Sequence, residues 1–133
     1  MKIDKKVLDN LTAQAAENPR MRMNLDMRNS AEDNSQRMLN AMEPGTELPI
    51  HRHMHSSETI IVLRGAVRHH IYDENGQEIE TVTLKPNSDC MGFDTPAGVW
   101  HRSESLEPGT VIFEAKDGKY QPLSENEIMH STN

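Results

Sequence analysis

Three scarcities limit what this chain can be. A single cysteine among 133 residues excludes an internal disulfide framework and fits a reducing compartment. Hydrophobic residues make up 35% and aromatic residues 4% of the chain, so we expect one domain whose core relies on aliphatic side chains and nine methionines. The sequence shows no run of 18 apolar residues and no charged-then-apolar leader. We therefore expect a cytoplasmic protein without membrane insertion.

Basic residues are scarce as well. Lys and Arg number 14 against 21 Asp and Glu, which gives a formal net charge of −7. Nucleic acids and anionic membranes both require a basic surface, so neither is expected as a main partner. The small supply of apolar side chains favours a protein that completes its core by burying one face against another subunit.

One stretch, GTELPIHRHMHSSETIIVLRG (45–65), concentrates side chains with metal-binding chemistry. His51 and His53 are two residues apart, so in a β-strand both would project from one face. Glu58 follows a short turn, on the next strand, and can approach them. Two imidazoles and a carboxylate form a mixed nitrogen and oxygen site that suits a divalent transition metal. His101 is the candidate for a fourth ligand.

The remaining histidines and the cysteine have less specific interpretations. His55 continues the alternation and is the rival of His53 as a ligand if the strand continues without a turn. Otherwise we expect His55 to contact a metal ligand without binding the metal, or to face solvent. His69 and His70 are adjacent on a predicted strand and face opposite sides, so they cannot both serve one site. A surface position is expected for both; the alternative is that one of them faces the barrel interior as a proton carrier. Cys90 is expected to be a small buried hydrophobe.

The chain begins with a helical pattern. In residues 3–19, Asp4 is a plausible N-cap and Pro19 ends the segment. The apolar residues that recur at helical spacing are Val7, Leu8, Leu11 and Ala15. We expect residues 1–19 to form an N-terminal helical extension that covers a sheet or reaches a partner subunit.

Most of the rest alternates in short runs separated by turn residues. Residues 20–28 carry methionine or leucine at every second position, which predicts a half-buried strand with core-filling methionines. Asn75-Gly76 between two alternating runs predicts a hairpin. The other expected strands are 36–42, 66–72, 77–84, 90–93, 99–103 and 110–116. Such spacing is typical of an antiparallel sandwich or barrel. In the last strand, Glu114 and Lys116 share a face and either neighbour the site or form a solvated pair.

The metal-binding stretch resembles the first cupin motif, G-x5-H-x-H-x4-E-x6-G. Every fixed position is matched: Gly45, His51, His53, Glu58 and Gly65. The second cupin motif, G-x5-P-x-G-x2-H-x3-N, is matched at Pro96, Gly98 and His101, whereas Cys90 replaces its glycine and Ser105 its asparagine. The resemblance implies an all-β fold, a cupin-type antiparallel β-barrel or jelly roll with a short N-terminal helix, and a homodimer.

A closer resemblance is to the WbuC family of cupin-fold metalloproteins. It covers residues 20–120, which leaves 121–133 as a polar C-terminal tail that wraps the surface or frays. The segments that carry it are QRMLNAMEPG (36–45), HRH (51–53), VLRG (62–65), AGVWH (97–101) and LEPGTVIFEAKDGKY (106–120). Lys119 departs from the proline of the family's G-P-Y. The resemblance implies a link to bacterial surface-polysaccharide metabolism and a carbohydrate-related small molecule as ligand.

Three functions are compatible with such a site. Three neutral nitrogens and one carboxylate leave a divalent Fe, Mn, Zn or Ni ion at a net charge of about +1 with open positions. Polarisation of a bound carbonyl or hydroxyl would suit a sugar isomerase or epimerase. A redox-active ion that binds oxygen beside a chelating substrate would make a dioxygenase. The third function is a non-catalytic, metal-dependent sensor of a small molecule, because a fold does not determine its function.

Overall fold

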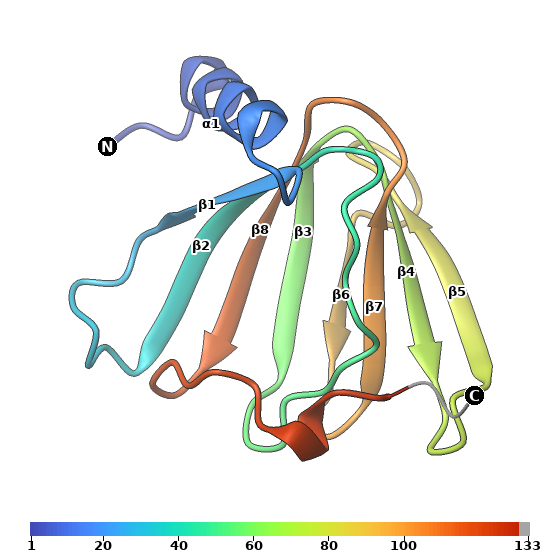
Figure 1. Ribbon diagram of the computed structural model, residues 1–133. Helices are drawn as coiled ribbons and strands as arrows, with labels where there is room; N and C mark the ends of the chain where they lie inside the picture. The colour runs from blue at the N-terminus through green and yellow to red at the C-terminus, as the bar shows by residue number, and fades with distance from the viewer. Residues whose placement is uncertain (131–133) are drawn as a thin grey trace.

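The computed structural model describes residues 1–130, which form one α-helix, a short 3-10 helix η1 (Glu125–Glu127) and two antiparallel β-sheets that face each other (Figure 1). The larger sheet has, in spatial order, β1 (Arg22–Asp26), β2 (Ser35–Met42), β8 (Thr110–Asp117), β3 (Glu58–Arg64) and β6 (Gly92–Thr95). The smaller sheet has β5 (Glu78–Leu84), β4 (Val67–Tyr72) and β7 (Trp100–Ser105). The predicted all-β, antiparallel fold is confirmed, although the two sheets stay separate and do not close into one barrel.

Apart from the segment that carries His51 and His53, each expected strand is present, with ends that shift by at most two residues. The hairpin between β4 and β5 turns at Asp73, whose side chain accepts hydrogen bonds from the backbone N–H groups of Asn75 and Gln77. Of the Asn-Gly pair only Gly76 has a positive φ, of 82°. The predicted hairpin therefore forms with a single left-handed residue.

Helix α1 (Lys5–Glu17) covers the outer face of the larger sheet over β1, β2 and β8. The Asp4 side chain caps it by accepting a hydrogen bond from the Val7 backbone N–H at 3.1 Å. Leu11 and Ala15 are buried against the sheet, among Leu39, Ala41 and Val111. The described residues contain no helix with the length and hydrophobicity that a membrane crossing requires.

The space between the sheets changes character along the strands. One end is an apolar core of Met42, Ile60, Val62, Val67, Leu84 and Ile112. Further along the paired strands β3 and β8, Glu58 stands opposite Lys116. Because side chains two residues apart share a face, both polar residues point into the same interior as Val62 and Ile112. The fold therefore closes one end with hydrocarbon and lines the other end with charged groups.

Gly65, the last residue of the first motif, is required by packing. Its φ is +83°, and a Cβ built there would lie 2.3 Å from Thr110 Oγ1 and 2.8 Å from the Thr110 Cα. We expect Gly65→Ala to lower the free energy of unfolding by about 2–6 kcal/mol, since backbone strain and overpacking add. Gly98→Ala is the matched control, because Gly98 has the same φ and no atom within 4 Å of its Cβ position. Equal losses in chemical denaturation would contradict the packing role.

Candidate metal centre

The segment that carries the first two histidines lies between β2 and β3, and it is not a regular strand, contrary to the prediction. His51 makes a single antiparallel bridge to β7: its N–H donates to His101 O at 3.0 Å, and the His101 N–H donates to His51 O at 2.8 Å. One further bond runs from the Gly98 N–H to His53 O at 2.8 Å. The ladder stops after one rung because β7 begins only at Trp100. These bonds place the two motifs side by side.

The C-terminal tail supports the other edge of the same segment. The Arg52 N–H donates to Glu127 O at 2.9 Å, and the Met129 N–H donates to Ile50 O at 2.8 Å. The tail was expected to wrap the surface or fray; residues 121–130 lie against this loop, and residues 131–133 fall outside the described part of the chain. Sequence reasoning missed this support because no local pattern in the tail points to a partner 75 residues away.

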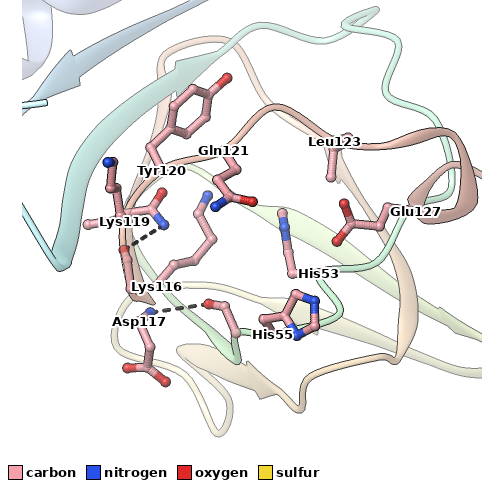
Figure 2. A pocket seen from close by; sticks show the side chains of 12 residues that line it. His53, His55, Lys116, Asp117, Lys119, Tyr120, Gln121, Leu123 and Glu127 are labelled. Atoms are coloured by element: carbon pink, nitrogen blue, oxygen red, sulfur yellow. Dashed lines mark hydrogen bonds between the residues drawn. The ribbon is translucent and has the colours of Figure 1, made fainter. Parts of the chain in front are cut away.

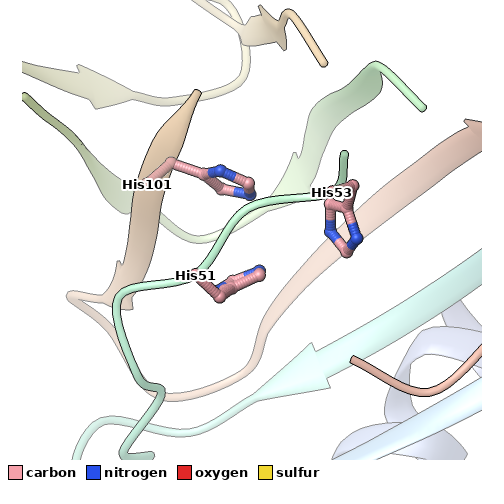
Figure 3. A group of neighbouring side chains, drawn as sticks. All are labelled: His51, His53 and His101. Atoms are coloured by element: carbon pink, nitrogen blue, oxygen red, sulfur yellow. The ribbon is translucent and has the colours of Figure 1, made fainter. Parts of the chain in front are cut away.

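The three histidines converge on one point (Figure 3). The potential ligand nitrogens of His51, His53 and His101 all lie within 4.8 Å of one another. Nδ1 of His51 is 2.9 Å from the Pro49 carbonyl, and Nδ1 of His101 is 2.9 Å from the Val99 carbonyl. A backbone carbonyl can only accept, so both Nδ1 atoms carry the hydrogen and both Nε2 lone pairs are free to bind a cation.

Glu58 completes the cluster as the first residue of β3. Its carboxylate oxygens lie 3.3 Å from His53 Nε2 and 3.4 Å from His101 Nε2. Both nitrogens are nevertheless buried without a hydrogen-bond partner of acceptable geometry, which is a costly state for a polar atom. A cation shared by the four side chains would satisfy both nitrogens. The residues present therefore fit a divalent transition metal, and their nitrogen-rich donor set suits Fe, Mn, Zn or Ni.

The charges within the cluster also favour a cation. Burial by itself raises the pKa of Glu58, but His101, His53 and Lys116 outweigh it, so this pKa lies well below its usual value. Burial, followed by the neighbouring His101, lowers the pKa of His51 to about 4, which keeps this imidazole in the neutral, metal-binding form at pH 7. For His101, burial lowers the pKa, but the Glu58 carboxylate reverses this and the net shift is upward.

A cavity of about 190 Å³, the central cavity, opens directly onto this cluster. Besides the four candidate ligands, its polar or charged lining includes Arg20, Arg22, Asn24, Asn40, Ser103, Glu114, Lys116 and Tyr120. Glu114 and Lys116 therefore neighbour the candidate site and do not form a solvated surface pair. Both face this cavity, and Lys116 Nζ lies 3.6 Å from Glu114 Oε2. Burial, and then the charge of Glu58, raises the pKa of Glu114.

A second cavity, the tail cavity, lies under the C-terminal segment and has a volume of about 460 Å³ (Figure 2). His53, Lys116 and Tyr120 line both cavities. His55, the rival of His53, is exposed and lines only the tail cavity. It stays outside the three-histidine cluster, as expected for a residue that faces solvent.

His69 and His70 correct the expectation of surface positions, because both are buried. His69 lies inside, with Nε2 3.0 Å from Thr95 Oγ1 and Nδ1 2.9 Å from the Ser103 hydroxyl. His70 lies on the other face, between the carboxylates of Glu78 and Glu104. Strand β4 is the middle strand of its sheet, so it offers no edge position to either residue. Cys90 is half-buried and packs against the apolar core, close to its predicted role.

Two lining residues escaped the sequence analysis. Arg22 belongs to the polar side of the alternating segment 20–28, whose apolar side packs under α1. Asn40 lies within β2, among apolar neighbours in sequence. The alternation of residues 20–28 separates its two faces correctly, but it does not tell whether the polar face meets solvent or a cavity.

Solved structures with the same fold are numerous, and their sequences are distant. KdgF from Halomonas sp. superposes with a TM-score of 0.60 at 17% identity, over 78% of this chain and 85% of that one. Oxalate oxidase in complex with glycolate gives 0.65 at 13% identity, over 82% of this chain. The capsular polysaccharide assembling protein CapF from Staphylococcus aureus gives 0.59 at 23% identity, over 68% of this chain.

These likenesses establish the fold, the predicted cupin-type jelly roll. The aligned region spans only 57% of the oxalate oxidase chain and 24% of the CapF chain. No curated protein matches the sequence. A family model matches residues 3–84, which include three of the four candidate ligands and are more than half of the chain. This protein therefore belongs to the family described as domain of unknown function DUF6016.

Proposed function

We propose that this protein binds a divalent transition metal through His51, His53, Glu58 and His101, and a polar small molecule in the central cavity. The observation that carries the proposal is the pair of buried Nε2 atoms, on His53 and His101, that lie beside a buried carboxylate and have no hydrogen-bond partner of acceptable geometry in the described part of the chain. Buried nitrogens that converge in this way beside a carboxylate are the expected result of a site built around a cation.

The chemistry that suits this site best is isomerisation or epimerisation of a sugar. The bound ion would supply Lewis-acid polarisation of a carbonyl or hydroxyl group. Glu114 and Lys116 line the same cavity, outside the ligand set, and their charged atoms are 3.6 Å apart. In this proposal the pair would hold and pass a proton at Glu114 Oε2, while the four ligands would hold the ion.

A role in surface-polysaccharide metabolism follows as the finer proposal. It rests on the sequence resemblance to the WbuC family, and it is supported by the description of CapF as a capsular polysaccharide assembling protein.

We also propose a cytoplasmic homodimer. Ile61, Leu63 and Met91 are each more than one third exposed, and the first two lie on β3 next to the sheet area that α1 covers. Sedimentation of the full chain tests the dimer.

Elemental analysis of the untagged protein, followed by a thermal-shift screen of sugars, sugar nucleotides and small acids, tests the proposal. We expect about one transition-metal ion per chain and a stabilisation of about 2.7 kcal/mol for a ligand at a hundredfold excess over its Kd. Turnover of that ligand without oxygen uptake would support an isomerase, and oxygen uptake would indicate the dioxygenase instead. Binding without turnover would indicate a sensor. Protein that stays metal-free after incubation with Fe, Mn, Zn and Ni would contradict the proposal.

A further inference from the structure

The central cavity collects cationic side chains in a chain that is acidic overall. Arg20, Arg22 and Lys116 all line it, although acidic residues outnumber basic ones 21 to 14. The charge of Lys116 is paired within the protein, since its Nζ lies 3.6 Å from a carboxylate oxygen of both Glu58 and Glu114. In residues 1–130, no ion pair within 4.0 Å involves either arginine. Neither guanidinium group therefore has an ion-pair partner within that distance, and the charge of the more distant Glu114 carboxylate only partly opposes the downward shift in the pKa of Arg22.

Arg22 is the better placed of the two. It is half-buried in β1, and no hydrogen bond of its guanidinium occurs within the described residues. Burial, and then the charge of Arg20, lowers the pKa of Arg22, which marks the free energy that this unpaired charge costs the folded protein. On the opposite face of β1, Met23 and Leu25 pack under α1, so the docked helix orients Arg22 towards the cavity. An anion bound there would offset the cost.

Asn40 adds a second unsatisfied group to the same cavity. It is only 7% exposed, and its Nδ2 donates to Glu114 Oε1 at 3.2 Å. Its Oδ1 is buried and has no hydrogen-bond partner among residues 1–130. A buried acceptor without a donor is uncommon, and a ligand hydroxyl would supply that donor. The volume of about 190 Å³ is below the range of about 300–1,000 Å³ that drug-sized ligands fill, which favours a molecule smaller than a nucleotide.

We propose that the small molecule of the central cavity is a hydroxylated anion: its carboxylate or phosphate group is bound by Arg22 with Arg20, and one hydroxyl donates to Asn40 Oδ1. This inference rests on the proposed function and names its substrate class, a hydroxy acid, sugar acid or sugar phosphate. Arg22 is then a specificity-determining residue outside the histidine cluster: it selects the charge of the ligand, whereas the cluster holds the metal.

The test is an NMR titration of the full chain that follows the Arg22 Nε–H signal, with glycolate and glycerol 3-phosphate as anions and glycolamide and glycerol as neutral counterparts. At about 20 mM, a range that detects millimolar Kd values, we expect at least one anion to shift the signal and neither neutral compound to do so. The anion with the lower Kd identifies the group. Acetate should bind more weakly than glycolate, and equal binding would remove the hydroxyl from the inference.

Arg22→Met should weaken anion binding at least about tenfold, because a charge-assisted hydrogen bond contributes about 1.5–3 kcal/mol. Arg68→Met is the control, since Arg68 is exposed on β4 and does not line the central cavity; it should leave the Kd unchanged. Unchanged affinity in a folded Arg22→Met protein, or no shift of the Arg22 signal in the wild type, would overturn the inference. Titrations of metal-free protein separate the anion inference from the metal proposal. Anion binding at Arg22 without bound metal would support the first and not the second. Bound metal without anion binding would support the second and not the first.

Discussion

Replacing His53 with alanine should lower metal affinity more than 100-fold. The substitution removes one of three nitrogens that lie within 4.8 Å of one another. Losing a partner that only supports a metal ligand already costs about 10–100-fold, so losing a ligand itself costs more. His51→Ala and His101→Ala should behave in the same way. Competition with a chelator of known affinity, followed by elemental analysis, measures the loss.

His55→Ala is the matched control for this series. His55 is two residues away, belongs to the same loop and is exposed outside the cluster, so its removal should leave metal stoichiometry intact. Metal retained by His53→Ala but lost by His55→Ala would move the site by two residues and refute the assignment. Glu58→Gln keeps the size of the side chain and removes its charge, and weaker, less selective binding is expected from it.

Deletion of residues 1–18 should lower the melting temperature by more than about 10 °C. The deleted segment includes Leu11 and Ala15, which are 4% and 0% exposed against the sheet. Val7 and Leu8 are partly buried in the same cluster. Burial of a leucine or valine contributes about 1.5–3 kcal/mol, so Val7, Leu8 and Leu11 together contribute on the order of 5 kcal/mol, and for a domain of this size each kcal/mol corresponds to a few degrees. Calorimetry of the truncated and full-length proteins measures the shift.

A shorter deletion, of residues 1–3, provides the control for the truncation. Met1 and Ile3 are 81% and 50% exposed and precede the Asp4 cap, so the melting temperature should stay the same. Metal content should be retained in both proteins because the candidate ligands lie between residues 51 and 101. If the longer deletion also leaves melting and sedimentation unchanged, the helix makes no net contribution to stability and the docking interpretation is wrong.

Much of the architecture could be predicted because its signals are local. Alternation along 20–28 and 110–116 separates two faces whatever the strands pair with, and Asp4 caps α1 through a neighbour three residues away. The candidate ligands could be named for the same reason, since His51, His53 and Glu58 are close together along the chain. Their convergence with His101 is an observed feature of the fold, while metal binding by these residues stays a prediction.

The predictions that were wrong depend on the tertiary neighbours of each residue. His69 and His70 were placed at the surface, but the middle position of β4 buries both. The segment that carries His51 was expected to be a strand, but only one rung forms against His101, and the tail supplies the other edge. In both cases some of the deciding contacts join residues more than thirty positions apart: β7 flanks His69 and His70, and His101 and the tail flank His51. A local pattern contains no information about such contacts, because strand pairing is set by the whole topology.

By itself, then, the sequence determined the strands, the capped helix and the identity of four converging side chains, since each depends on spacing along the chain. Only the tertiary structure decided what the polar faces meet. Arg22 and Glu114 lie on the polar faces of strands whose sequences alternate between polar and apolar residues. The same sequence pattern would occur if those polar faces were exposed to solvent. Docking of α1 on the outer face of the larger sheet turns these side chains inward, and the interior they enter is too polar to pack as a core. That interior is the cavity next to the histidines.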